Sequence, residues 1–239
     1  MKKMIKAMGL MALMMIAVLI AVPLSMSAQT KITWSGDMSE GLARATDTNG
    51  KFGFVDETGK VVIPCKWEHA YPFSEGLAGV KDVNNKWGFI DKKGKVVIPC
   101  KWKDIRPDFK DGLAVVKDDN NKWGYVDKKG KVVIPCKWKL AEVFSEGLAY
   151  VKDDNDKYGF IDKTGKVVIT CKWNGANAFH EGLAGIKDAS GKWGYIDKTG
   201  KVVIPCKWDT VWEFENGRAM VRDDKGKYHY LDKTGKEVK

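Results

Sequence analysis

Five cysteines carry the most reactive side chains of this chain, and they recur at spacings of 35 or 36 residues. Thiols can form disulfides, bind zinc or act as nucleophiles. Zinc is not expected, because the sequence has no CxxC pair and only three histidines. A disulfide needs two Cα atoms within about 7 Å, and equivalent positions of stacked repeats usually lie farther apart. We therefore expect free, buried thiols that pack as small apolar side chains, with disulfides as the alternative. The five are Cys65, Cys100, Cys136, Cys171 and Cys206.

Neither the histidines nor the acidic loops predict a catalytic or metal site. His69, His180 and His229 occupy three different phases of the repeat, and no Ser or Cys lies in a distinct local motif that would complete a triad. The loops 118–121 and 153–156 superficially resemble calcium loops. They lack the spacing and the closing bidentate Glu of an EF-hand, so ordinary hairpin turns are expected. The sequence thus predicts no enzyme, no catalytic residue, no metal and no cofactor.

One aromatic row is the only candidate ligand site. Trp87, Trp123, Tyr158 and Trp193 share one position of the repeat, so stacked units would align them. An exposed row could stack on sugars or on another planar ligand. A buried row would be part of the core, with the adjacent Gly leaving room for a neighbour's ring. The core interpretation is favoured for most of these rings, and the remainder are the candidate binding residues.

These residues belong to an internal repeat that covers most of the chain. Gly-Leu-Ala begins at Gly41 and returns every 35 or 36 residues, ending as Gly217-Arg218-Ala219. An aromatic-Gly pair, Asp-x-x-Gly-Lys and Val-Val-Ile-Pro-Cys-Lys-Trp follow in register. Self-similarity at this period indicates a repeat architecture in which each unit needs its neighbours. We count six units, the last one truncated.

Each unit predicts about three short antiparallel strands. The segment 86–90 alternates Trp87 and Phe89 with Gly88 and Ile90, which is the period of a strand. The following Asp91-Lys92-Lys93-Gly94 is typical of a tight hairpin. A linker with one recurring Phe joins successive units, and this side chain is expected to fill the joint between neighbours. Its copies are Phe73, Phe109, Phe144, Phe179 and Phe214, with Met38 in the first unit.

The motifs also carry a resemblance. The segment 86–95, Lys-Trp-Gly-Phe-Ile-Asp-Lys-Lys-Gly-Lys, and the segment 73–78, Phe-Ser-Glu-Gly-Leu-Ala, resemble the WG-repeat (KWG-repeat) family of bacterial proteins over roughly residues 36–239. The resemblance implies a repeat architecture and no established activity. The segment 227–235 is more weakly similar to the aromatic hairpins of choline-binding and other cell-wall-binding repeats, whose unit is shorter.

The N-terminus predicts export. Lys2, Lys3 and Lys6 precede sixteen residues, Ala7 to Val22, without a polar side chain, and small residues follow. This order is typical of a signal peptide, here residues 1–28, and is too short for the roughly 20 residues of a membrane span. Residues 29–239 are then one repeat domain without a stable membrane span, in the periplasm, on the cell surface or secreted. The formal net charge of +10 is spread evenly, which does not favour nucleic acid.

Two functional classes and two architectures remain open. The chain is either a non-catalytic binding module, for a glycan, a cell-wall polymer or a protein, or a structural spacer or assembly subunit without a ligand. The fold is an all-β propeller-like or barrel-like ring, with an open β-solenoid as the alternative. The ring is favoured because Lys31-Ile32-Thr33-Trp34 resembles the end of a third strand, while the last unit stops as its own third strand begins. An N-terminal strand would then complete the last unit.

Overall fold

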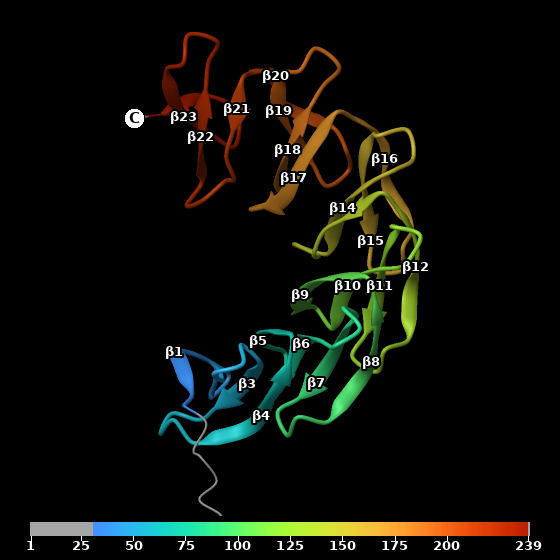
Figure 1. Cartoon of the computed structure of the whole chain (residues 1–239). Coiled ribbons are helices and arrows are strands. Elements are labelled where there is room, and N and C mark those ends of the chain that lie inside the picture. The colour runs from blue at the N-terminus through green and yellow to red at the C-terminus, as the bar shows by residue number, and fades with distance from the viewer. Residues whose placement is uncertain (1–30, 239) are drawn as a thin grey trace, which may run out of the picture. The chain divides into compact units, whose positions relative to one another are not determined.

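The computed structural model describes residues 31–238, and this part of the chain forms six four-stranded antiparallel sheets. The predicted signal peptide, residues 1–28, lies outside the described residues. In each sheet the strands lie in chain order, so every unit is a simple up-and-down sheet. Consecutive sheets follow one another along a curved row, with the fourth strands on its outer side (Figure 1). The prediction of an all-β tandem-repeat fold is confirmed.

The strands are given by their position in the sheet. The first strands are β1 (Thr33–Ser39), β5 (His69–Ser74), β9 (Asp104–Lys110), β13 (Leu140–Ala141), β17 (Gly175–His180) and β21 (Thr210–Val211). The second strands are β2 (Leu42–Thr46), β6 (Leu77–Lys81), β10 (Leu113–Lys117), β14 (Leu148–Lys152), β18 (Leu183–Lys187) and β22 (Arg218–Arg222). The third strands are β3 (Phe52–Val55), β7 (Trp87–Asp91), β11 (Trp123–Asp127), β15 (Tyr158–Asp162), β19 (Trp193–Asp197) and β23 (Tyr228–Asp232). The fourth strands are β4 (Val61–Trp67), β8 (Val96–Trp102), β12 (Val132–Trp138), β16 (Val167–Trp173), β20 (Val202–Trp208) and β24 (Glu237–Val238).

The predicted number of three strands per unit is wrong, because the linker between units is itself a strand. In the second unit β5 pairs with β6, and its register shifts between Ala70 and Phe73. This irregularity breaks the period-2 pattern, so the segment does not look like a strand in sequence. The Phe that it carries still does what the sequence predicts. Phe73 contacts Phe54 of the preceding sheet at a ring-centroid distance of 4.8 Å, and Phe109 contacts Phe89 at 5.0 Å.

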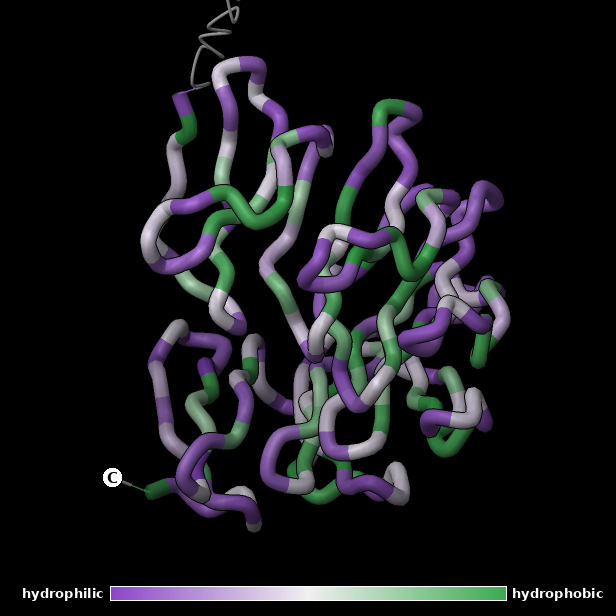
Figure 2. The backbone as a smooth tube through the Cα atoms, turned by 90° about the horizontal axis from the view of Figure 1, so that it is seen from below, coloured by the Kyte–Doolittle hydropathy of each residue, from purple (hydrophilic) through white to green (hydrophobic). Residues whose placement is uncertain are grey.

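The turns follow from Asp and Gly. At the hairpin between β7 and β8, the Gly94 amide donates to the Asp91 carbonyl (2.9 Å), and the Asp91 carboxylate accepts from the Lys93 and Lys95 amides. Gly94 has a φ of 78°, which side chains with a Cβ rarely adopt. Hydrophilic residues gather at such loops (Figure 2), while apolar clusters fill the joints between successive sheets. Stacking against a neighbour is therefore what buries the core.

A repeated clasp joins each sheet to the next one. Glu146, at the turn between β13 and β14, accepts a hydrogen bond from the Gly182 amide (3.0 Å) and pairs with Lys198 (3.0 Å), both in the following unit. The other four acid–lysine pairs have the same geometry, with N–O distances of 2.9–3.0 Å: Glu40–Lys92, Glu75–Lys128, Asp111–Lys163 and Glu181–Lys233.

The two end units lack the matching halves of this clasp. The acid position of the last unit is Asn216, and the lysine position of the first unit is Glu57. The predicted latch is also not formed, since β1 pairs only with β2 and β24 pairs with β23. Ile32, which the latch would have placed on the last unit, packs instead against Ala43, Ala45 and Val55. An open row is compatible with this pairing, because no sheet is shared between the first and the last unit among residues 31–238.

Candidate functional site

The structure places the four residues of the aromatic row in four consecutive sheets. Trp87 and Trp123 are buried, whereas Tyr158 and Trp193 are half-buried. Each ring is faced by a cation from the neighbouring strand of its own sheet. The nitrogens lie 5.1–6.0 Å from the ring centroids, in the pairs Lys81–Trp87, Lys117–Trp123, Lys152–Tyr158 and Lys187–Trp193. Tyr71 also stacks on Trp87. These contacts occupy much of the ring surface, and a role of the row in ligand binding stays a prediction.

The Gly that follows each of these aromatic residues has a different role from the one expected. A Cβ on Gly88 would lie 2.5 Å from the Ile98 carbonyl oxygen and 2.7 Å from the Cys100 nitrogen. The glycine therefore makes room for the backbone of the neighbouring fourth strand and not for a ring of the next unit. The register of β7 against β8 shifts between Trp87 and Phe89, which brings the two backbones this close.

The five cysteines are free, as predicted, but they are half-buried. Burial raises the pKa of the Cys100, Cys136, Cys171 and Cys206 thiols to about 11, and nearby aspartates act in the same direction. Such thiols are mostly protonated near neutral pH, and the thiolate is the nucleophilic form. Their environment is that of packing side chains at the joint between sheets.

The histidines lie in separate sheets, as their phases predict. Burial lowers the pKa of His69, with the nearby Arg44 and Lys81 charges adding to the effect. Hydrogen bonds that the His229 ring donates to the Glu237 and Asp223 carboxylates raise the pKa of His229. The loop 153–156 is a turn in which the Asp153 carboxylate accepts the Asn155 and Lys157 amides. Residues 31–238 hold no group of three or more His, Cys, Asp or Glu side chains arranged for a metal ion.

The first strands of successive units, together with the residues that follow them, come together at a hollow of about 650 Å³. Its lining comes from five consecutive units, and it surrounds the buried Phe109 and Phe144. We call this space the inner hollow. It is lined by Ser74, Glu75, Asp108, Phe109, Lys110, Val143, Phe144, Ser145, Ala178, His180 and Glu213.

Two positions of the repeat provide the chemical variety of the inner hollow. They flank the recurring Phe, which is itself buried in every unit from the second to the last. The position before the Phe holds Pro72, Asp108, Val143, Ala178 and Glu213, and the position after it holds Ser74, Lys110, Ser145, His180 and Glu215. Ser74 and Ser145 donate to the carbonyls of Phe109 and Phe179 in the next unit, at 3.1 and 2.7 Å. His180 Nε2 lies 3.4 Å from Glu213 Oε1, across the joint between the last two sheets.

Sequence reasoning missed the inner hollow. The available signal was that the residues beside an unchanging Phe differ from unit to unit, while the rest of the repeat is regular. The sequence pattern predicts a linker for this segment, and only the pairing of the first strands with the second strands brings its residues to a common surface.

The family of the chain follows from its repeats. A model of the WG-containing repeat matches residues 52–87, 87–123, 123–158, 158–192 and 193–228, which is more than half of the chain. The chain belongs to the WG-repeat family. This confirms the resemblance carried by the aromatic-Gly pairs, and the lack of room for a Cβ at Gly88 gives the Gly of that pair a structural reason. No curated protein matches the sequence significantly.

Solved structures show the same kind of fold as this WG-repeat chain. The computationally designed protein Ika8 is similar with a TM-score of 0.53 and 12% identity, covering 88% of this chain and 74% of its own. BamB from Moraxella catarrhalis is similar with a TM-score of 0.50 and 12% identity, covering 84% and 71%. Four-stranded antiparallel sheets in sequence are also the blades of β-propellers. The described residues contain no helix long and apolar enough to cross a membrane.

Proposed function

We propose that this chain is an exported, non-catalytic binding module that holds its ligand in the inner hollow. The observation that supports this proposal is the gathering of variable side chains at one place. Asp108, Lys110, His180 and Glu213 depart from the repeat and line one concave surface built by several units. A structural spacer needs only the regular positions, whereas a binding site needs side chains of particular charge and shape in a concavity.

The lining supports recognition more than catalysis. The lining of the hollow includes one histidine, His180, beside the Glu213 carboxylate, and it includes no cysteine. The cysteines lie elsewhere, on the fourth strands, with raised pKa values. The proposal of export rests on the order of basic, apolar and small residues in positions 1–28.

A binding experiment on residues 29–239 tests the module. The purified protein is screened by equilibrium binding against oligosaccharides, isolated cell-wall polymer and defined peptides. A variant with Asp108→Ala and Lys110→Ala should bind its ligand at least about tenfold more weakly. The matched control is Asp119→Ala with Lys93→Ala, two exposed loop residues of the same charges. If wild type binds nothing, or if both double variants bind equally well, the hollow is not a ligand site and a spacer role is favoured.

Export is tested separately by fractionation of the source cells and N-terminal sequencing. The mature chain is expected to begin after Ser27 or Ala28 and to be found outside the cytoplasm. Full-length protein with an intact Met1 in the cytosol would contradict this part of the proposal without touching the binding role.

A further inference from the structure

The inner hollow continues onto the last sheet. His180 and Glu213 also line a second hollow of about 450 Å³, which reaches Trp212 and Glu215. Trp212, Glu213 and Glu215 in turn line a third hollow of about 310 Å³ beside Tyr230. Neighbouring hollows share lining residues and are therefore adjacent, and we call the three together the trough. An extended chain fits such a trough better than a compact small molecule.

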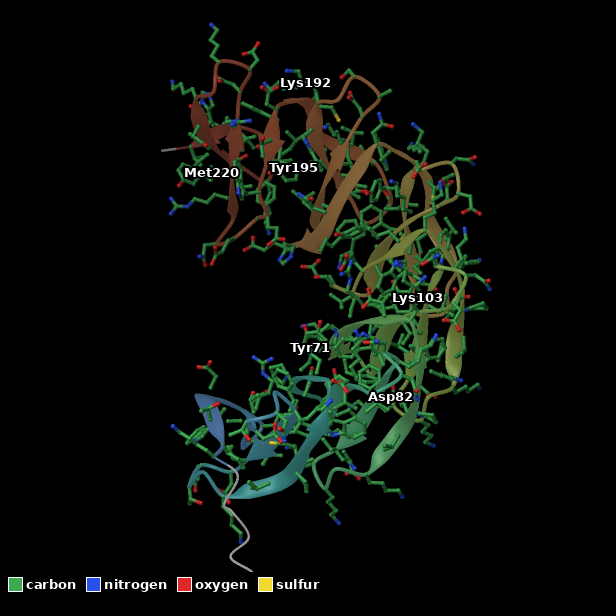
Figure 3. The ribbon with its side chains drawn as sticks, viewed as in Figure 1. Tyr71, Asp82, Lys103, Lys192, Tyr195 and Met220 are labelled. Atoms are coloured by element: carbon green, nitrogen blue, oxygen red, sulfur yellow. The ribbon has the colours of Figure 1, made fainter. Side chains whose placement is uncertain are left out.

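Aromatic rings are exposed at the far end of the trough. Trp212 is 38% and Tyr230 is 43% exposed. The equivalent of Tyr230 in the fifth sheet is Tyr195, which is buried and contacts Phe214 of the last sheet at a ring-centroid distance of 4.9 Å. Figure 3 shows Tyr195 between the last two sheets and Met220, which lines the third hollow, on the last sheet. An interior aromatic position of the repeat is therefore a surface position here.

The polar groups beside these rings suit hydroxyl groups. Glu213 and Glu215 are exposed carboxylates that accept hydrogen bonds, and Arg218 lies over the Tyr230 ring at 5.2 Å. The face of an aromatic ring is electron-rich and attracts the C–H groups of a sugar ring, while carboxylates accept from the sugar hydroxyls. Flat rings edged by acceptors are thus complementary to a saccharide.

The charge of the trough argues against a polyanion. The chain has a formal net charge of +10, but the trough carries carboxylates at Glu75, Asp108, Glu213 and Glu215 against the cations Lys110 and Arg218. Glu75 is already neutralised by its ion pair with Lys128, which leaves three carboxylates against two cations. A binding site for nucleic acid or an acidic cell-wall polymer would be lined mainly by lysine and arginine. The near balance of charge is complementary to an uncharged chain.

A second copy of this chain is a poor occupant of the last sheet. Each interior sheet is held to the next by an acid–lysine clasp, and continuing the row with the first sheet of another copy would juxtapose Asn216 and Glu57. This pair cannot form the ion pair found at the other joints. The first sheet is also already covered, since Ala43 and Val55 are fully buried.

We propose that the trough binds a neutral glycan chain, with sugar rings stacked on Trp212 and Tyr230 and hydroxyl groups hydrogen-bonded to Glu213 and Glu215. This assignment rests on the proposed function of the inner hollow and names its ligand class. It extends the site beyond that hollow, because the stacking residues lie on the last sheet.

Calorimetric titration of residues 29–239 with uncharged hexasaccharides of glucose (cellohexaose, maltohexaose) and of N-acetylglucosamine (chitohexaose) tests the proposal. At least one should bind, and it should bind about tenfold more tightly than its disaccharide because only a longer chain spans the trough.

Trp212→Ala and Tyr230→Ala should each weaken binding about tenfold, and Trp212→Phe should weaken it less. Trp34→Ala is the matched control, because Trp34 is 41% exposed on β1 and lines none of the three hollows. Circular dichroism checks that each variant is folded.

The outcomes separate this inference from the proposed function. Absence of binding by all three hexasaccharides at millimolar concentration overturns the glycan assignment. If a peptide then binds and Asp108→Ala with Lys110→Ala weakens it, the binding module stands with another ligand class. Tighter binding of a sulfated heparin hexasaccharide than of any neutral one also overturns the assignment. If Trp34→Ala weakens glycan binding as much as Trp212→Ala, the trough is not where the glycan lies.

Discussion

At the scale of single residues, the glycine of the aromatic-Gly pair is the most constrained position of the repeat. A Cβ on Gly88 meets two backbone atoms of the fourth strand, and backbone cannot move aside as the end of a flexible side chain can. We expect Gly88→Ala to lower the free energy of unfolding by about 1–3 kcal/mol, the range for overpacking of a tight interior. Urea denaturation followed by tryptophan fluorescence measures this loss.

The control for Gly88→Ala is a substitution of an exposed side chain. Val83 is 70% exposed in the loop before β7, so Val83→Ala should change the free energy of unfolding by less than about 0.5 kcal/mol. Equal stability of Gly88→Ala and wild type would show that the two strands are not held as close as described.

The thiols give a residue-scale prediction with a defined pH window. Because burial raises four of the five pKa values from 9.0 to about 11, alkylation of the native protein should be slow at pH 8 and accelerate only as the pH approaches 11. The folded state prefers the neutral thiol, so this contribution to stability is full below pH 9.0 and decreases as the pH rises through about 11. Mass spectrometry after iodoacetamide treatment counts the modified sites.

Denaturation without a reductant should expose all five thiols to labelling. Recovery of disulfide-linked peptides from unreduced protein would refute the assignment of free cysteines. Native labelling at pH 8 as fast as in denaturant would refute their protected environment.

At the scale of the elements, the clasps connect sheets that share no backbone hydrogen-bond ladder. Glu146→Gln keeps an acceptor for the Gly182 amide and removes the ion pair with Lys198. An exposed ion pair contributes about 0.2–1 kcal/mol, so a loss of stability in that range is expected by chemical denaturation. Glu57→Gln is the matched control, since Glu57 occupies the lysine position of the first unit and has no clasp. Equal effects of both variants on the free energy of unfolding would show that the ion pair of the clasp does not contribute to stability.

The same clasps predict a dependence on acid. The hydrogen bond from Lys92 lowers the pKa of Glu40 below 4.5, and that from Lys233 does the same for Glu181. A lowered pKa means that the contribution is full above the ordinary pKa and is lost as the pH falls through the folded-state pKa. Thermal unfolding between pH 7 and pH 2 should therefore show a loss below about pH 4.5 that is smaller in a variant with Glu40→Gln and Glu181→Gln.

At the scale of the whole repeat row, the question is whether the first unit supports the last one. Thr33 and Trp34 pair with Thr46 and Ala45, and Ile32 packs under the first sheet. Removing residues 31–34 from the mature chain should accelerate amide exchange in residues 42–55 and leave residues 218–238 unchanged. Hydrogen exchange followed by mass spectrometry measures both segments, with the chain 29–239 as reference. Faster exchange in 218–238 would show that the N-terminal strand acts on the last unit after all.

The sequence by itself determined the periodic features, because these depend on local chemistry. Asp and Gly at fixed offsets specify the hairpins, alternating side chains specify the third strand, and the lone Phe of the linker was correctly assigned to the joint between units. Equivalent cysteines in successive units were correctly kept apart as free thiols, because their spacing follows from stacking.

The tertiary structure decided what depends on two segments that are distant in sequence. The first strand of each sheet has no alternating pattern of side chains. It is a strand because its backbone pairs with the second strand, as β5 pairs with β6, and this pairing is visible only in the tertiary structure. The use of Gly88 depends in the same way on the backbone of β8, ten residues farther along. The lining of the inner hollow comes from five units at once, so no single repeat contains its pattern. The predicted latch is wrong for a related reason. Ile32 packs on the nearby first sheet, and likeness between two strand ends does not decide which sheet a strand joins.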